Sequence, residues 1–169
     1  MLDKFGMSIS KVVSTPLSNL FKISLDQCPK IDAEVEYMSN VPYASVVGCL
    51  MYVMVCTRLD LAQAVSQVCK FMSKPGKRHW ETVKCIFMYL KGTMRYGIMF
   101  SSKQGNPSVV GYVDLDYVSD MDDRRYITWY VFTLAGGHIC WKSSVQYILA
   151  MSTTEAEYTT TGEAVKEAL

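Results

Sequence analysis

The stretch that decides the fold is Val109-Val110-Gly111-Tyr112-Val113-Asp114-Leu115-Asp116. Valine and tyrosine favour extended backbone, so this stretch predicts a strand over about residues 109–114 with an aspartate at its end. Side chains alternate along a strand, and Asp114 and Asp116 would therefore lie on the same side. Their spacing permits both to lie near one bound metal ion.

A second acidic stretch, Ser152–Tyr158, predicts the start of a helix at Thr153. Ser152 followed by Glu155 is a capping box, in which the glutamate reaches back to the helix start. Glu157 is then the carboxylate free to face the sheet. Carboxylates at a strand end and a helix start suggest a Mg²⁺ site, and a phosphodiester is the substrate that such a site favours.

Two more strands are predicted between the two acidic stretches, over about residues 128–134 and 138–141. The second of them has an irregular continuation to Ala150. Gly136-Gly137 between them is a hairpin signal. A short strand is also predicted over Tyr96–Phe100. The polar loop at residues 101–107 marks the natural boundary between two units.

The first half of the chain predicts three short helices in a compact bundle. The first runs from Pro42 to about Val55 and is expected to be a buried helix. The second follows a capping-type signal, Thr57 with Asp60, and ends at Pro75. Its expected buried face comprises Leu59, Ala62, Val65, Val68, Cys69 and Met72. The third runs from about Lys77 to Lys91 and buries Trp80, Val83, Ile86, Phe87 and Leu90.

Composition supports a packed globular protein, because half of the 169 residues are hydrophobic and a fifth are charged. The formal net charge is +1, but seven basic residues and one acidic residue lie between Lys70 and Arg95. Six of the basic residues fall at the end of the second helix and on the polar face of the third: Lys70, Lys74, Lys77, Arg78, Lys84 and Lys91. They are either a solvated helix face or a surface that contacts nucleic-acid phosphates.

The six cysteines show no metal-binding or disulfide spacing, and no secretory signal precedes them. The simplest interpretation is a reduced, intracellular protein, cytoplasmic or nuclear. The most apolar run, Val46–Val55, has 10 residues and falls short of the ~20 needed to cross a bilayer. No membrane partner is therefore expected.

Other kinds of site are less consistent with the sequence. The acidic series that continues through Asp120, Asp122 and Asp123 could be a calcium loop, but it lacks the glycine and the bidentate glutamate of that motif. A solvated acidic loop is the stronger alternative. His79 and His138 are the only histidines, and no nucleophile has a triad context, so triad hydrolysis is not expected. His79 is expected to be a satisfied polar residue.

Motifs along nearly the whole chain resemble the Pol polyprotein of plant copia-type retrotransposons. In the second half they are Gly111–Asp116, Asp122–Arg125, Tyr130–Leu134, Gly136-Gly137, Trp141–Ser143, Gln146 and Ser152–Tyr158. In the first half they are Val13–Leu17, Val41–Ser45, Leu50–Tyr52, Cys56–Arg58, Lys74–Lys77 and His79–Glu81.

Residues 1–38 show no sustained periodicity and are expected to form an extended, partly ordered connector with one short helix near residues 1–9. The resemblance implies an α+β fold in which this connector is followed by a helical thumb-like region of reverse transcriptase (39–95) and the first half of a ribonuclease H-like domain (96–169). It implies hydrolysis of the RNA strand of an RNA–DNA hybrid with Mg²⁺, with Asp114 and Glu157 as catalytic and metal-binding residues. Asp116 then serves as a polar neighbour. The basic helix face would bind the hybrid or duplex, and the remaining Pol polypeptide is a further partner.

The chain departs from the family pattern at several points. The polymerase palm is absent, and two later acidic residues of the ribonuclease are not in this sequence. Trp129 replaces a glycine and Leu59 replaces a proline. We therefore expect a fragment or degenerate copy that is inactive as an isolated chain. The alternatives are a non-catalytic nucleic-acid-binding or structural remnant, and a product without molecular function.

Overall fold

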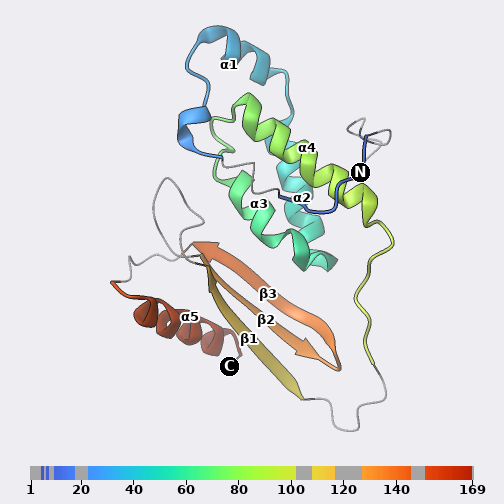
Figure 1. Ribbon diagram of the computed structural model, residues 1–169, viewed down its shortest axis with the longest axis vertical. Helices are drawn as coiled ribbons and strands as arrows, with labels where there is room; N and C mark the ends of the chain where they lie inside the picture. Colours follow the sequence, from blue (N-terminus) through green and yellow to red (C-terminus); the bar gives the residue numbers. More distant parts are fainter. Residues whose placement is uncertain are drawn as a thin grey trace. The chain divides into compact units, whose positions relative to one another are not determined.

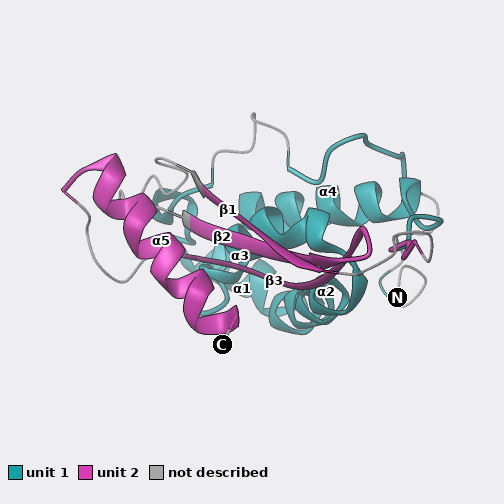
Figure 2. Cartoon of the chain, turned by 90° about the horizontal axis from the view of Figure 1, so that it is seen from below, with its two compact units in different colours: residues 1–97 teal, residues 98–169 magenta. Residues whose placement is uncertain are grey.

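The computed structural model describes residues 5, 7, 10–17, 23–101, 108–116, 127–145 and 151–168. The chain forms two compact units, residues 1–97 and residues 98–169, drawn in different colours in Figure 2. The described part of the first unit is helical, and the second combines an antiparallel sheet with one helix. The predicted α+β class is confirmed.

Four α-helices make up the described part of the first unit (Figure 1). They are α1 (Asp32–Ser39), α2 (Tyr43–Thr57), α3 (Ala62–Cys69) and α4 (Lys77–Gly92), with 3-10 turns at η2 (Leu25–Gln27) and η3 (Leu59–Leu61). The last helix matches its predicted range closely. The connector prediction for residues 1–38 missed α1. That helix buries only Met38, so it lacks the apolar stripe by which a helix is recognised. The predicted short helix near residues 1–9 lies mostly outside the described residues.

Helix α2 is buried on one side only, which corrects the prediction of a buried helix. Tyr43, Val46, Val47 and Leu50 are buried, but Met51, Tyr52 and Val55 on the other side are 41%, 73% and 66% exposed. A helix that is apolar all round gives no periodicity from which to tell the packed face from the open one.

The predicted capping signal of Thr57 and Asp60 was wrong. The turn η3 between α2 and α3 has no side-chain cap. The carboxylate of Asp60 instead accepts hydrogen bonds from Nε and Nη2 of Arg58, at 2.9 and 2.7 Å. A guanidinium that is buried needs a charged acceptor, and this requirement determines where Asp60 points. Met72, predicted in the core, is 38% exposed because it lies beyond the end of α3.

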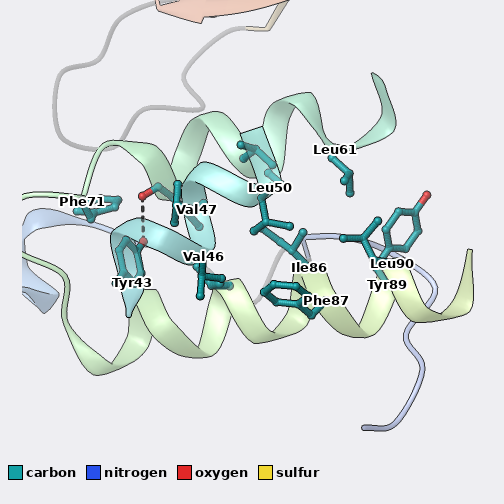
Figure 3. Packing of buried hydrophobic residues seen from close by; sticks show 14 of the residues in the cluster. Tyr43, Val46, Val47, Leu50, Leu61, Phe71, Ile86, Phe87, Tyr89 and Leu90 are labelled. Carbon is teal, nitrogen blue, oxygen red and sulfur yellow. Dashed lines mark hydrogen bonds between the residues drawn. The ribbon is translucent and has the colours of Figure 1, made fainter. Parts of the chain in front are cut away.

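The core of the first unit lies among α2, α3 and α4 (Figure 3). Val46, Leu50, Val65, Ile86 and Phe87 are at most 1% exposed. The Tyr43 hydroxyl in this cluster is satisfied, because it donates to the Val68 carbonyl oxygen at 2.9 Å. The apolar faces predicted for the second and third helices are the ones that pack here, with Trp80 half-buried at the margin.

The second unit contains β1 (Val109–Asp116), β2 (Ile127–Leu134), β3 (Gly137–Val145) and α5 (Thr153–Ala168). The strands are antiparallel in the order β1-β2-β3. The turn between β2 and β3 is one residue earlier than the glycine pair predicts, because Ala135 and Gly136 adopt φ angles of 50° and 81°. The predicted strand Tyr96–Phe100 is absent. Its neighbour Ser101 donates its N–H to the Ala135 carbonyl at 2.8 Å.

Helix α5 packs on one face of this sheet, as Figure 1 shows. The hydroxyls of Thr128 on β2 and Thr160 on α5 are 3.1 Å apart. The Tyr130 hydroxyl donates to Oε2 of Glu167 at 3.1 Å. Burial and this carboxylate together raise the pKa of Tyr130 to about 12. Thr128, Tyr130, Thr160 and Ala164 therefore form the small interface between helix and sheet.

Among the described residues, no single helix has both the length and the apolar composition needed to cross a membrane, although α1 and α2 pass that test as a pair bent by 53°.

Candidate carboxylate site and basic helix face

Asp114 lies on the edge strand β1 and its side chain is exposed. Its partner across the strand pair is Trp129 of β2. Asp116 ends the same strand opposite Ile127, and its side chain lies outside the described residues. Because β1 pairs only with β2 in the described part of the chain, Asp114 stands at the margin of the sheet rather than at its centre.

Glu157 lies early in α5, where the capping box predicted from the sequence is present. The N–H of Glu155 donates to Oγ of Ser152 at 3.1 Å, and the N–H of Met151 donates to Oε2 of Glu155 at 2.8 Å. Glu155 is thus occupied in holding the helix start, as expected. Glu157 is exposed and takes no part in the cap.

The strand register separates the two predicted ligands. Residues directly opposite each other in an antiparallel pair share a face, so Asp114 lies on the face of Trp129. Thr128 contacts α5, and side chains alternate along β2, so the face of Trp129 is the one turned away from that helix. The structure therefore places Asp114 and Glu157 at neighbouring elements but on different sides of the sheet.

This arrangement does not fit a bound Mg²⁺ ion. The described residues contain no group of three or more histidine, cysteine, aspartate or glutamate side chains placed to hold a metal. Two exposed carboxylates that start from opposite faces cannot share one ion without a change in the strand or further ligands. The acidic residues Asp120, Asp122 and Asp123, and with them the calcium-loop alternative, lie outside the described residues.

The basic residues fall into two groups by what they touch. Lys91 donates from Nζ to the Ser10 carbonyl at 2.7 Å, and Nζ of Lys84 lies 5.5 Å from the centre of the Trp80 ring. Lys70 is half-buried at the end of α3. By contrast, Lys74, Lys77 and Arg78 are exposed, and Arg78 forms a long, exposed ion pair of 3.6 Å with Glu81.

His79 is buried and both of its ring nitrogens have hydrogen-bond partners, in agreement with the prediction of a satisfied polar residue. Its Nδ1 accepts the N–H of Gly76 at 2.8 Å, and its Nε2 lies 3.1 Å from the Ser24 carbonyl oxygen. The imidazole also stacks on Phe71 with ring centres 3.9 Å apart. The donor at Nε2 and the acceptor at Nδ1 describe a neutral ring that joins the start of α4 to the segment before η2.

A buried polar network surrounds Arg58, and the sequence patterns did not predict it. Its Nη2 donates to Oδ2 of Asp60 at 2.7 Å and to Oγ1 of Thr93 at 2.6 Å, while Nη1 donates to the Thr93 carbonyl at 3.3 Å. The Tyr89 hydroxyl donates to the same Asp60 oxygen at 2.6 Å. A basic and an acidic residue two positions apart at a helix break are the only signal of it in the sequence.

Comparison with known proteins identifies the family. No protein-family profile and no solved structure matches the chain. Over 167 residues, 99% of the chain, it is 47% identical to the retrovirus-related Pol polyprotein from transposon TNT 1-94 of Nicotiana tabacum, covering 12% of that protein. It is 44% identical over 132 residues, 78% of the chain, to the secreted RxLR effector protein 161 of Plasmopara viticola, covering 92% of that protein.

A third relative is the retrovirus-related Pol polyprotein from transposon RE2 of Arabidopsis thaliana, 34% identical over 159 residues, which are 94% of this chain and 10% of that protein. The chain thus spans about a tenth of the length of these Pol relatives. Two different plant Pol polyproteins match it along almost its whole length, in agreement with the motifs read from the sequence. The chain belongs to the retrovirus-related Pol polyproteins of copia-type plant transposons.

Proposed function

We propose that this chain derives from the part of a Pol polyprotein that joins the thumb-like region of reverse transcriptase to the first half of a ribonuclease H domain. The observation that carries the proposal is the 47% identity to a Pol polyprotein over 99% of the chain, which includes both Asp114 and Glu157. The ancestral reaction would be cleavage of the RNA strand of an RNA–DNA hybrid. Mg²⁺ would activate the attacking water and stabilise the leaving oxygen.

The isolated chain is not an active nuclease in this proposal. Asp114 and Glu157 lie on different sides of the sheet, and the described residues offer no third ligand. Two carboxylates hold a catalytic ion poorly unless a substrate phosphate and further ligands complete its shell. In a complete domain, additional acidic residues would have to supply the missing ligands. Pairing of a further strand with the open edge of β1 would also have to turn Asp114 toward the face on which α5 packs.

Nucleic-acid binding by the first unit is a separate part of the proposal. Lys74, Lys77 and Arg78 carry it, because they are exposed and close together in the sequence, Lys74 just before α4 and the other two at its start. Lys84 and Lys91 are assigned to packing, since the first stacks on Trp80 and the second holds Ser10. Binding to phosphates would release counterions and weaken steeply with salt.

The test compares the isolated chain with a fusion that continues into the segment following the match in the TNT 1-94 Pol polyprotein. Both are incubated with Mg²⁺ and an end-labelled RNA–DNA hybrid. We expect no cleavage by the isolated chain and cleavage by the fusion. Asp114→Asn and Glu157→Gln should each abolish that cleavage, whereas Glu163→Gln, a matched change further along α5, should leave it unchanged.

Two results would contradict the proposal. Cleavage by the isolated chain that is lost in Asp114→Asn would show that its site is complete. A fusion that folds but does not cleave would instead favour the alternative, a non-catalytic remnant. The observation that favours this alternative is Trp129, whose large side chain is directly across from Asp114 on the same face.

A further inference from the structure

The first unit contains a cavity of about 530 Å³ outside the carboxylate site. Its walls are η2 and the following residues, one side of α1, and the first residues of α4. This volume is within the range of about 300–1,000 Å³ that small-ligand sites occupy. The sequence did not predict it, because α1 was not recognised as a helix.

The walls of this cavity are held by specific contacts. A Cβ on Gly76 would lie 1.9 Å from the carbonyl oxygen of Gln27, so only glycine allows α4 to approach η2 so closely. His79 ties Gly76 to Ser24 by the two hydrogen bonds described above. On the opposite wall the N–H of Lys30 donates to Oε2 of Glu34 at 3.0 Å. The cavity is therefore part of the folded unit and not a gap between loose segments.

The side chains that line the cavity combine three chemistries. Lys30, Lys77 and Arg78 are cationic and exposed. Tyr37 presents an aromatic ring that is 51% exposed, beside the apolar Ile31 at 60%. Asp26 and Glu34 add carboxylates, which accept hydrogen bonds from amino groups.

We propose that this cavity binds one nucleotide of a single-stranded nucleic acid. The cations would contact its phosphate, the Tyr37 ring would stack on its base, and a carboxylate would accept from an exocyclic amine. A purely acidic ligand would be repelled by Asp26 and Glu34, and a purely apolar one would make no use of the five charged side chains that line the cavity. The inference rests on the nucleic-acid binding proposed for this unit, and it adds the base-contacting residue Tyr37.

The test uses the full chain and a labelled single-stranded DNA of about ten nucleotides, with binding followed by fluorescence anisotropy. Tyr37→Ala should weaken binding by roughly fivefold or more, the effect of losing one stacked base. Tyr37→Phe, which keeps the ring, should retain the affinity. Tyr52→Ala is the matched control, because Tyr52 is an exposed tyrosine on α2 outside the cavity. Adenosine monophosphate should compete with the DNA.

A charge series separates the cavity from general attraction to phosphates. Lys77→Gln should reduce the slope of log binding constant against log salt concentration by about 0.7, which is the contribution of one phosphate contact on a single strand. Lys84→Gln should leave this slope unchanged. If Tyr37→Ala behaves like Tyr52→Ala, the cavity proposal is overturned while binding through Lys77 and Arg78 stands. If the unmodified chain does not bind the DNA, both fail, and the cleavage test of the fusion still decides the hydrolase ancestry.

Discussion

At the scale of single residues, Arg58 is the buried charge on which the first unit most depends. It is 7% exposed and donates to both Asp60 and Thr93, so it joins the break after α2 to the end of α4. Partial burial acts to raise the pKa of Asp60, but hydrogen bonds from Arg58 and Tyr89 outweigh it and hold the pKa below its ordinary value of 3.8.

Replacing Arg58 should therefore destabilise the protein strongly. We expect Arg58→Met to lower the free energy of unfolding by about 2–3 kcal/mol, because it removes the ion-pair partner of Asp60 and the guanidinium donor to the Thr93 carbonyl. Arg78→Met is the control, and its exposed ion pair should contribute no more than about 0.5 kcal/mol. Urea unfolding followed by far-ultraviolet circular dichroism measures both. Equal effects of the two changes would contradict the assigned role of Arg58.

The same network predicts a pH dependence. A carboxyl whose pKa is lowered by folding stabilises the folded state above its unfolded pKa, and this contribution is lost as the pH falls through the folded value. The difference in stability between the wild type and Arg58→Met should thus be full at neutral pH and shrink below about pH 4. Urea titrations at a series of pH values test this, and a difference that grows on acidification would exclude Asp60 as the partner.

At the scale of secondary-structure elements, Gly76 just before α4 and Gly48 inside α2 should respond in opposite ways to replacement by alanine. Gly76→Ala should destabilise by about 1–3 kcal/mol, since its Cβ would meet the backbone of η2 and separate α4 from it. Gly48→Ala in the exposed interior of α2 meets nothing within 4 Å and should stabilise by about 0.5–1 kcal/mol. Thermal unfolding compares the two. Similar effects of both would show that η2 does not pack on α4 in this way.

The edge of β1 is the element most prone to self-association. Val109, Val110 and Tyr112 are 58%, 43% and 56% exposed, and β1 has a single partner strand among the described residues. Edge strands of this kind pair with other chains unless a charge prevents it. Tyr112→Lys should slow aggregation in light-scattering assays, whereas Tyr158→Lys, the same change on exposed α5, should not. Equal effects would mean that net charge alone controls solubility.

At the scale of the whole molecule, the two units differ in how much core they have. The buried hydrophobic cluster lies entirely in residues 1–97, whereas the described part of the second unit buries only Tyr130, Val131, Ala156 and Ala164 among its hydrophobic residues. Small cores leave little free energy to oppose the entropy of the chain.

Hydrogen exchange should therefore distinguish the units. We expect slow exchange for the amides of α2, α3 and α4 and faster exchange through β1, β2, β3 and α5. The fusion used in the cleavage test serves as a comparison, because completing the sheet should slow exchange in β1 first. Uniform, strong protection of both units in the isolated chain would contradict the view that the second unit has the weaker core.

The sequence by itself determined the elements whose signals are local. The heptad-like apolar spacing of α4, the alternating strand that carries Asp114 and the Ser152–Glu155 capping box each depend on neighbours within a few positions, so each was predicted with nearly correct bounds. The family was readable too, because its motifs lie in one order along the chain.

Tertiary structure alone decided which faces those elements present. Helix α2 is apolar on all sides, and only its packing shows that Met51, Tyr52 and Val55 remain outside the core. Asp60 could cap a helix or pair with Arg58, and burial of the guanidinium selected the pair. Asp114 and Glu157 are far apart in sequence, so their spacing does not show whether they meet. The strand register sets the face of the sheet on which Asp114 lies, and helix α5, which carries Glu157, packs on the other face. Side-chain direction depends on non-local contacts, which residue spacing does not encode.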